Sequence, residues 1–305
     1  MSRVKVSVIQ TGPSSTNKET NLQSALKLCE RIANTEPDFV VFPELFLTPY
    51  FCTRSGVNPE NLGYSESTEG ASVRAFSKVA REYGCYVILP FLERAADALY
   101  YNSATLLGPD GGLVKGTLPD GSTVASYRKN HLSNYWSENL VLDEYPYMKP
   151  GRGFPIFETR FTKVGILICK DSIFPESWRV LALQGAQVIF VPSSSPNVFS
   201  GTWVCGLSAS ALANQLFGVA CNRAGTEEGT MYFGLSCVVG PDGHVIAKAA
   251  EGRPDAVTAA LDLDEIPRQK KAQDVFRDRR PDLYGPILRE TNQKQNQDQL
   301  APPGE

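Results

Sequence analysis

The chain has 305 residues, of which 42% are hydrophobic, so it can bury a large core and form a globular protein. Its formal net charge of -3 and its isoelectric point near 5.6 offer no basic surface to nucleic acid. No stretch of 18 consecutive apolar residues is present, and the N-terminus lacks the apolar segment of a secretion signal, so we expect a cytoplasmic protein that binds neither nucleic acid nor membrane.

The cysteines and histidines limit the chemistry that the chain can perform. The cysteines are odd in number, widely spaced and without a CxxC pair; they are Cys29, Cys52, Cys85, Cys169, Cys205, Cys221 and Cys237. This pattern indicates neither a disulfide framework nor a zinc site. His131 and His244 are too few for a histidine-rich metal site. We therefore expect reduced thiols and no metal or organic cofactor.

The first ninety residues alternate between strand and helix patterns. Short apolar stretches are typical of strands, and apolar residues three and four apart are typical of helices. The predicted elements are strands over 4–10, 38–44 and 85–93 and helices over 17–33 and 69–84. Gly84 is suited to end the second helix. A β-α-β unit followed by another helix and strand predicts an α/β fold.

The next sixty residues are rich in strand patterns and end in a segment without a regular period. Two strands are predicted within 100–116, with a turn from Pro109 to Gly112, and another strand over 124–132. Residues 133–154 contain aromatics, prolines and acids at irregular spacing. We predict a long ordered loop there, lying over a site.

The remaining chain repeats the alternation of strands and helices. The predicted elements are strands within 156–169 and over 187–195, 217–225 and 256–263, a hairpin over 235–249 that turns at Pro241-Asp242-Gly243, and helices over 175–186, 203–216 and 264–280. No linker-like composition divides the body. We predict a single α/β domain over residues 1–290, built from two β-rich halves with helices on their outer faces, and a polar C-terminal tail over 291–305.

Three predicted strands end in a side chain that would be costly to bury without a purpose: Glu44, Lys129 and Cys169. Residues just beyond strand ends converge on one crevice in an α/β sheet, so these three can meet. A carboxylate can take the proton of a thiol, and a lysine can stabilise an oxyanion together with the backbone N–H of Lys170. The set therefore predicts nucleophilic catalysis by Cys169.

Other interpretations of the same residues remain open at this stage. Free cysteines are most often small buried hydrophobes, Glu44 alone could cap a helix, and Lys129 alone could be a charge at a strand edge. His131 lies two residues beyond Lys129 and would share its face of a strand, so a cysteine-histidine pair is a rival catalytic arrangement.

The stretches FPELFLTPY, YRKNHL and GILICKDSIFPESWR together resemble the three signature blocks of the carbon-nitrogen hydrolase (nitrilase) superfamily. The resemblance runs from residue 3 to about residue 290. It implies that Glu44 is the general base, Lys129 stabilises the oxyanion and Cys169 is the nucleophile. It also implies a second glutamate that orients the lysine, for which Glu144 is the best match and Glu138 the alternative.

The resemblance further implies a four-layer α-β-β-α sandwich and a homodimer or larger homo-oligomer. In this family the helix after the nucleophile and the C-terminal segment commonly form the subunit contacts. The implied reaction is acyl transfer to water through a thioester, with release of ammonia or an amine. The resemblance also implies that His131 is a neighbour that supports the site and is not itself the general base.

Residues after the nucleophile point to a branch of the family. Cys169 is followed by Lys170 and Asp171, whereas true nitrilases tend to carry Cys-Trp-Glu, so we expect a small linear amide or N-carbamoyl substrate. The stretches ESWRVLALQGAQVI, TEEGTMYFGLSCVVGPDGHVIA and RRPDLYG are most similar to the carbamoylase branch. Hydrolases of N-carbamoyl-D-amino acids bind the substrate carboxylate with an arginine pair, and this chain has Ser172-Ile173-Phe174 instead.

This departure favours a neutral, aromatic or cationic substrate group. The residues predicted to bind substrate, besides His131, are Phe174, Tyr135 and Trp136 for an apolar group, Ser194 and Ser195 at the rim, and Glu138 and Asp143 for an amine. Lys170 has two interpretations, a solvated surface lysine or a cation that lowers the thiol pKa and receives an anionic substrate group. Alternative functions are a non-catalytic binding or assembly member of the fold and a true nitrilase.

Overall fold

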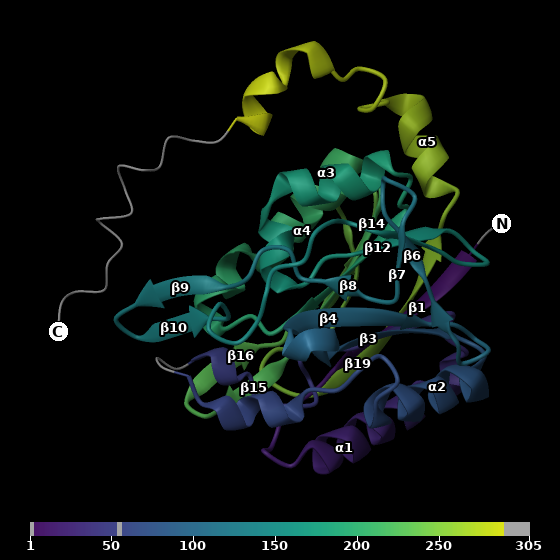
Figure 1. The fold of residues 1–305 in the computed structure, drawn as a ribbon. Coiled ribbons are helices and arrows are strands. Elements are labelled where there is room, and N and C mark those ends of the chain that lie inside the picture. Colours follow the sequence, from purple (N-terminus) through teal and green to yellow (C-terminus); the bar gives the residue numbers. More distant parts are fainter. Residues whose placement is uncertain (1–2, 54–56, 290–305) are drawn as a thin grey trace.

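The computed structural model describes residues 3–53 and 57–289, and two β-sheets lie face to face at its centre (Figure 1). Within these ranges the first sheet has the strand order β19-β1-β2-β3-β4-β5, with β8 paired to β4. Its strands are β1 (Arg3–Gln10), β2 (Phe39–Val41), β3 (Tyr86–Arg94), β4 (Tyr100–Leu107), β5 (Leu113–Val114), β8 (Tyr127–Arg128) and β19 (Asp255–Asp262). The pairs β1-β2 and β2-β3 are parallel, so their carboxyl ends share one edge of the sheet.

The second sheet has a related plan, with the order β18-β17-β14-β13-β12-β11-β6-β7. Its strands are β6 (Gly116–Thr117), β7 (Thr123–Val124), β11 (Ile156–Glu158), β12 (Lys163–Ile166), β13 (Val188–Ser193), β14 (Phe217–Asn222), β17 (Cys237–Val239) and β18 (Val245–Lys248). Here β12, β13 and β14 are parallel. Two hairpins stand apart from both sheets: β9 (Asn134–Ser137) with β10 (Leu140–Asp143), and β15 (Ala224–Glu227) with β16 (Thr230–Phe233).

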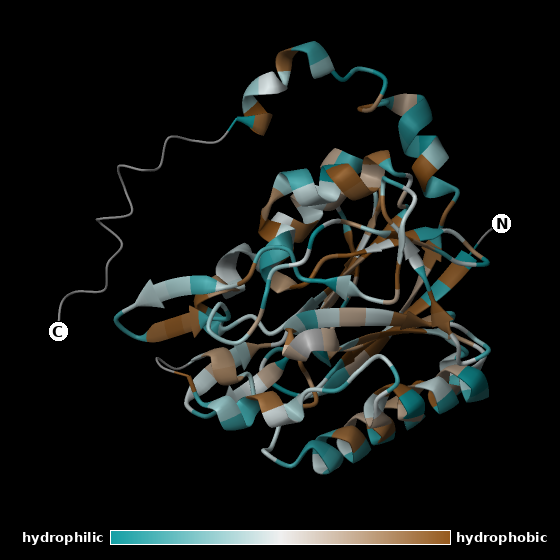
Figure 2. Cartoon of the chain, viewed as in Figure 1, coloured by the Kyte–Doolittle hydropathy of each residue, from teal (hydrophilic) through white to brown (hydrophobic). Residues whose placement is uncertain are grey.

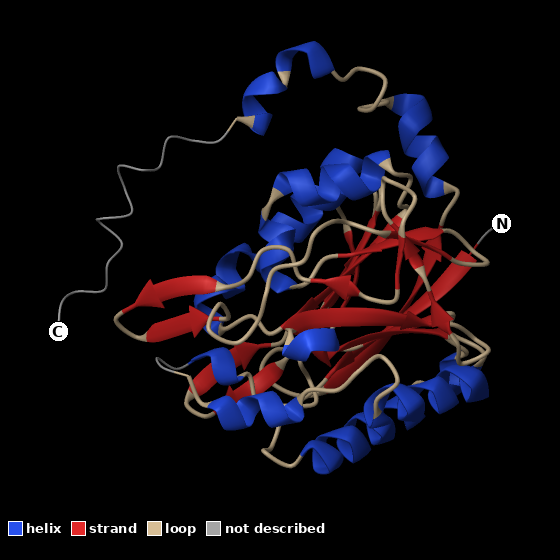
Figure 3. Cartoon of the chain, in the orientation of Figure 1, coloured by secondary structure: helices blue, strands red, loops and turns tan. Residues whose placement is uncertain are grey.

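Helices cover the outer face of each sheet (Figures 1 and 3). They are α1 (Lys18–Glu30) and α2 (Ala71–Tyr83) on the first sheet, α3 (Pro175–Leu183) and α4 (Ser200–Asn214) on the second, and α5 (Glu265–Ala272) near the C-terminus. Short 3₁₀ helices connect these elements: η1 (Ala33–Thr35), η2 (Phe51–Thr53), η3 (Pro59–Tyr64), η4 (Ala96–Ala98), η5 (Cys169–Ile173), η6 (Asn197–Phe199), η7 (Pro281–Leu283) and η8 (Gly285–Leu288). The expected four-layer α-β-β-α sandwich is confirmed.

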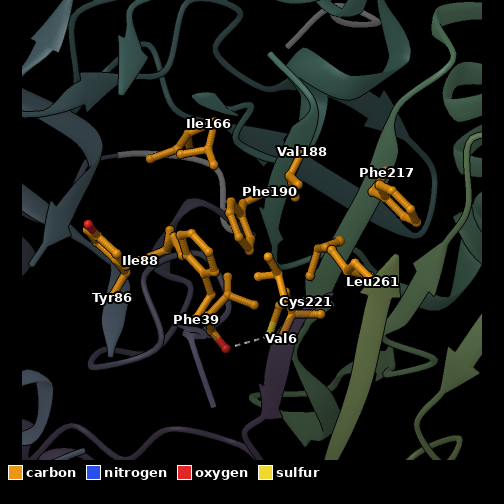
Figure 4. Close-up of a cluster of buried hydrophobic side chains, with 14 of the residues drawn as sticks. Val6, Phe39, Tyr86, Ile88, Ile166, Val188, Phe190, Phe217, Cys221 and Leu261 are labelled. Atoms are coloured by element: carbon orange, nitrogen blue, oxygen red, sulfur yellow. Dashed lines mark hydrogen bonds between the residues drawn. The ribbon is translucent and has the colours of Figure 1, made fainter. Parts of the chain in front are cut away.

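The layers form because apolar side chains alternate along the central strands. In β2, Phe39 and Val41 point into the core between the sheets, whereas Val40 and the next residue, Phe42, pack toward α1 and α2. In Figure 4 residues of both sheets meet in the inter-sheet core, among them Val6, Phe39, Ile88, Ile166, Val188, Phe190 and Leu261. In Figure 2 the central strands are largely brown, and teal residues are frequent along α1 and α2. Burial of both strand faces therefore fixes the four layers.

Local signals place the helix ends. Asn17 caps α1, and its side chain accepts a hydrogen bond from the N–H of Thr20. Gly84 ends α2 with φ of 61°, a left-handed conformation that favours glycine, as predicted. Among the helices of residues 3–53 and 57–289, none has the length and apolar character needed to cross a membrane.

Three element predictions were partly wrong. Residues 133–154 do not form one loop, because the hairpin β9-β10 lies within them. The single strand predicted over 124–132 is reduced to β7 and β8, two residues each, which pair in different sheets. The helix predicted over 264–280 is only α5, and the chain after it continues without a regular helix past α3 (Figure 1), where the Phe276 ring lies 4.9 Å from the Arg179 guanidinium. The predicted tail over 291–305 lies outside the described residues.

Candidate active site

Glu44 lies just beyond β2 and its side chain is fully buried. One carboxylate oxygen, Oε1, accepts hydrogen bonds from Lys129 Nζ at 2.7 Å and from Asn102 Nδ2 at 2.7 Å. The other, Oε2, accepts the backbone N–H of Ser194 at 2.9 Å. The carboxylate is thus held by three donors from three different segments of the chain.

Lys129 directly follows β8 and is also fully buried. Its ammonium donates to Glu44, to Glu144 at 2.9 Å and to Ser133 Oγ at 3.2 Å. Burial alone would lower the pKa of Lys129, but the charges of Glu144 and Glu44 raise it well above its ordinary value. The lysine therefore remains a cation within the site.

Glu144 follows the hairpin β9-β10 and faces the same ammonium. Besides Lys129, it accepts hydrogen bonds from Tyr50 Oη at 2.9 Å, Asn102 Nδ2 at 2.9 Å and the N–H of Ser133 at 2.6 Å. Glu138, the alternative considered from the sequence, is exposed at the hairpin turn. Glu144 is therefore the second glutamate that contacts the lysine.

The two glutamates differ in their pKa. Burial raises the pKa of Glu44, and the charge of Glu144 adds to this rise against the lowering by Lys129. Burial also raises the pKa of Glu144, but the charge of Lys129 and the hydrogen bonds to Ser133 and Tyr50 outweigh it and lower the pKa. Glu144 thus holds the negative charge opposite Lys129, and Glu44 is the more basic carboxylate.

Cys169 begins η5, three residues after β12, and is half-buried. Its φ of 48° lies in the left-handed region, which is strained for a residue other than glycine and recurs where a side chain must be presented at a sharp turn. Burial and the charge of Glu44 raise the pKa of the thiol. The charge of Lys129 and the N–H of Ser194 lower it by less, so the pKa stays above its ordinary value. The thiol is therefore protonated and needs a base to become a nucleophile.

Asp171 was not among the predicted site residues, yet it joins the turn of Cys169 to the segment of Lys129. It is fully buried and accepts hydrogen bonds from Tyr127 Oη at 2.5 Å, the N–H of His131 at 2.8 Å and the N–H of Ile168 at 3.1 Å. His131 Nδ1 lies 2.8 Å from the same carboxylate. Its only signal in the sequence was its position two residues after Cys169, within the third signature block.

His131 and Phe174 pack against each other beside this carboxylate. Their rings stack with centroids 3.9 Å apart. Over residues 3–53 and 57–289, the hydrogen bonds of His131 lead to Asp171, and none joins it to the sulfur of Cys169. The cysteine-histidine pair is therefore not assembled, and His131 supports the site from the side.

Lys170, Ser194 and Ser195 were predicted to bind substrate, and each makes a contact within the protein. The half-buried Lys170 donates from Nζ to the carbonyl oxygen of Leu132 at 3.0 Å, and burial followed by the charge of Lys129 lowers its pKa. Ser194 Oγ donates to the backbone oxygen of Glu44 at 2.7 Å, and the N–H of Ser195 donates to an Asn222 side chain at 2.8 Å. Ser194 thus holds Glu44 in place at both its backbone oxygen and its carboxylate.

Tyr135 and Trp136 lie on the exposed hairpin β9-β10. The Tyr135 ring packs edge-on against Phe199 with centroids 5.3 Å apart, and Trp136 Nε1 donates to Asn134 Oδ1 at 3.0 Å. The structure therefore places these two rings on the protruding hairpin and does not bring them against the buried cluster of Glu44, Lys129 and Glu144.

Sequence reasoning also missed Arg223 and Glu227, which hold the turn after Glu44. Fully buried Arg223 donates from Nη2 to the carbonyl oxygens of Leu45 at 2.9 Å and Thr48 at 3.1 Å, and it is paired with Glu227. Glu227 accepts the N–H of Tyr50 at 2.7 Å. An arginine inside a predicted apolar strand was the available signal, because such a charge is costly to bury without partners.

Within the described part of the chain, no group of three or more histidine, cysteine or acidic residues is arranged to hold a metal ion. The groups that the cluster brings together are a thiol, two carboxylates of different basicity and an ammonium. Such a set can form and hydrolyse an acyl-cysteine intermediate.

Comparisons with known proteins agree with this chemistry. A family model described as carbon-nitrogen hydrolase matches residues 5–271. A nitrilase of Pyrococcus abyssi is 33% identical over 92% of this chain and 99% of its own, and an N-carbamoylputrescine amidase of Arabidopsis thaliana is 31% identical over 88% and 90%. A carbon-nitrogen hydrolase structure from Helicobacter pylori superposes with a TM-score of 0.84 at 26% identity, covering 94% of this chain and 99% of that one.

Proposed function

Since the chain belongs to the carbon-nitrogen hydrolase family, we propose that it is a cysteine-dependent amidohydrolase that cleaves a small linear amide or N-carbamoyl compound through a thioester. The observation that carries this proposal is the buried contact of Lys129 with both Glu44 and Glu144, beside the strained turn of Cys169. Burying two carboxylates and a lysine together costs desolvation free energy, and a purely structural role would not explain this cost because apolar side chains could fill the same space.

In the proposed acylation step, Glu44 accepts the thiol proton as the sulfur of Cys169 attacks the substrate carbonyl carbon. The raised pKa of Glu44 supports this role, because a more basic carboxylate is a better match for a protonated thiol. The tetrahedral intermediate then collapses, the C–N bond breaks, and the leaving nitrogen takes the proton from Glu44. Ammonia or an amine departs and the acyl group stays on sulfur.

Lys129 and the backbone N–H of Lys170 are proposed to stabilise the oxyanion. All three protons of the Lys129 ammonium already have acceptors, and the longest of these contacts is the one to Ser133 Oγ at 3.2 Å. The oxyanion would replace Ser133 as acceptor, while the two carboxylates keep the ammonium in place. Deacylation follows when Glu44 deprotonates a water that attacks the thioester, which returns the thiol and an acid.

The substrate class rests on the residues next to Cys169. The absence of an arginine pair at Ser172-Ile173-Phe174 favours a substrate without an amino-acid carboxylate, such as an amide or an N-carbamoyl amine. Lys170 donates one hydrogen bond to the Leu132 carbonyl, and its ammonium has two further N–H groups that could bind a single anionic group. The second candidate function is that of a true nitrilase, and the likeness to the Pyrococcus nitrilase supports it.

A release assay for ammonia tests the proposal across primary amides, N-carbamoyl amines, N-carbamoyl amino acids and the matching nitriles. We expect turnover of amides or carbamoyl amines, with carbamoyl amino acids poorer. Preference for a nitrile over its amide would replace the proposal with the nitrilase candidate. Binding of these compounds without turnover of any would favour the non-catalytic alternative.

We also propose that residues 1–290 act as one domain and that the chain forms a homodimer or larger assembly in the cytoplasm. All seven cysteines are free, which supports a reducing compartment. The segment beyond α5 passes α3 (Figure 1), where Phe276 contacts Arg179, and then exposes Leu283, Ile287 and Leu288 at 60%, 58% and 89%. Such side chains are expected to pack against a second copy of the chain.

A further inference from the structure

A cavity of about 470 Å³ lies behind the strand segment that carries Lys129. Arg128 lines it, whereas the next side chain, Lys129, points to the opposite side toward Glu44, as neighbouring residues in an extended strand do. Neither Glu44, Lys129, Glu144 nor Cys169 lines the cavity. Its volume lies within the range of small-molecule sites, roughly 300–1,000 Å³. The cavity is therefore separate from the candidate active site.

Among the side chains that the structure describes, the charged ones that line the cavity are three arginines and one glutamate: Arg94, Arg128, Arg152 and Glu93. Burial would raise the pKa of Glu93, but hydrogen bonds from Arg128, Ser103 and Ser126 lower it, so it stays a carboxylate. This carboxylate neutralises only one of the arginines. The described side chains thus give the cavity an excess of two positive charges.

Arg128 is fixed in the cavity wall. Its Nε donates to Glu93 at 3.2 Å, its Nη2 is paired with the same carboxylate, and the guanidinium lies 4.0 Å from the centre of the Tyr101 ring. Its Nη1 makes no hydrogen bond with the described residues. The exposed guanidiniums of Arg94 and Arg152 likewise have neither an ion pair nor a hydrogen bond within residues 3–53 and 57–289. Three sets of N–H donors are therefore available to a ligand.

We propose that this cavity is a second ligand site that takes a small organic dianion, a phosphate monoester or a dicarboxylate. Guanidinium groups bind such oxyanions through paired hydrogen bonds, which a lysine cannot match. Leu118, Val124 and Pro155 form an apolar part of the wall, which suits the carbon portion of the ligand.

The site borders the backbone of the candidate catalytic lysine. Gly151, which also lines the cavity, donates its N–H to the Lys129 carbonyl at 2.8 Å. A side chain cannot replace this glycine without a shift of the backbone, because a Cβ atom would lie 2.1 Å from the carbonyl oxygen of Arg128. The wall of the cavity and the segment of Lys129 are therefore in rigid contact.

Calorimetric titration of the full chain with phenyl phosphate and, separately, with succinate tests the site. The titrated protein carries Cys169→Ala to prevent turnover, and phenol serves as the uncharged probe. The test variant adds Arg94→Gln and Arg152→Gln, whose side chains are exposed and should not affect folding. The matched control adds Arg253→Gln, an exposed arginine that does not line the cavity.

We expect at least one dianion to bind saturably at one site, phenol not to bind, and the double arginine substitution to weaken binding by about tenfold or more. Arg253→Gln should leave the affinity unchanged. The tighter of the two probes identifies the head group as phosphate or carboxylate. Absence of saturable binding by both dianions, or equal affinity in the double variant, would overturn the proposal.

Discussion

At the scale of single residues, the candidate site is a buried cluster of two carboxylates and one ammonium. Desolvation makes such a cluster costly unless every charge has hydrogen-bond partners. Asn102 reduces the cost by donating to both Glu44 and Glu144, and Tyr50 donates to Glu144. The partners are distributed unequally, so the two glutamates differ in basicity, and this difference separates the proposed base from the residue that holds the lysine.

The dependence of kcat/KM on pH should report the raised pKa of Glu44. The carboxylate form of Glu44 is present above that pKa and is lost as the pH falls through it, so activity should decline on the acid side at a pH above the ordinary pKa of a glutamate. The measurement uses an uncharged amide substrate across the acid range.

Glu138→Gln is the matched control for this profile, because Glu138 is an exposed glutamate on the hairpin. It should leave the acid limb in place, whereas Glu44→Gln should remove acylation. An acid limb at or below the ordinary glutamate pKa would show that Glu44 is not the base.

Sequence reasoning placed Glu44, Lys129 and Cys169 at strand ends, because a charged or reactive side chain there breaks an apolar pattern. It could not find Asn102 or Tyr50 in the same way. Asn102 lies inside β4 and Tyr50 in an irregular turn, where polar and aromatic residues are common and carry no pattern. Only the three-dimensional structure shows that both side chains reach Glu144.

At the scale of elements, the turn after β2 determines the site, because it carries both Glu44 and Tyr50. Leu45 in this turn has a left-handed φ of 47°. Arg223 and Glu227, from the end of β14 and from β15, hold the turn by its carbonyl oxygens and by the N–H of Tyr50. Arg223 after β14 and Glu227 of the hairpin β15-β16 thus fix the turn at the carboxyl end of β2.

Arg223→Lys should lower kcat by about 10–100-fold with little change in KM. A lysine keeps the charge opposite Glu227, but its single ammonium cannot donate to the carbonyls of Leu45 and Thr48 with the fork geometry of a guanidinium. The resulting shift of Glu44 affects the chemical step more than substrate binding. Steady-state kinetics measure the loss of kcat, and thermal denaturation measures separately whether the substitution also lowers the stability of the fold.

Arg268→Lys provides the control, since Arg268 forms an exposed ion pair with Asp262 at 2.7 Å. This substitution should change neither kcat nor stability by much, because exposed ion pairs contribute about 0–1 kcal/mol. If Arg223→Lys were as active as the unchanged protein, the buried arginine would have no part in positioning the base.

Element predictions failed where the chain has no strong period. The segment 133–154 contains the hairpin β9-β10, but Asn134–Ser137 is exposed on both faces and shows no alternation. Strand β8 has only two residues, so Lys129 is positioned by hydrogen bonds with Asn102 and Gly151 rather than by a long strand. The conformations of the hairpin β9-β10 and of the Lys129 segment therefore depend on specific contacts that a periodic pattern does not reveal.

At the scale of the whole molecule, the strand and helix patterns predicted two β-rich halves with helices on their outer faces, and the family resemblance implied their four-layer arrangement. Alternate burial along strands such as β2 and β13 requires cover on both faces of each sheet. The course of the chain beyond Ala272 was not predictable, because it depends on contacts with distant residues, such as those of Phe276 with Arg179 and of Gln273 with Gln215.

Analytical ultracentrifugation should give a mass in solution above the monomer mass of 33.4 kDa. Leu283→Ser, Ile287→Ser and Leu288→Ser together should shift it toward the monomer, because these exposed apolar side chains would lose their contacts with a second copy. Leu99→Ser, another exposed leucine, is the control and should leave the assembly intact. A monomer before any substitution would contradict the proposed assembly.

The central claim is that Cys169 attacks the substrate, and turnover by cysteine variants tests it most directly. Ammonia release from the best amide or carbamoyl substrate is measured for Cys169→Ala and for Cys205→Ala, which removes the exposed cysteine. We predict that Cys169→Ala folds normally and has no measurable turnover, while Cys205→Ala keeps full activity. Unchanged ammonia release by Cys169→Ala would contradict the account.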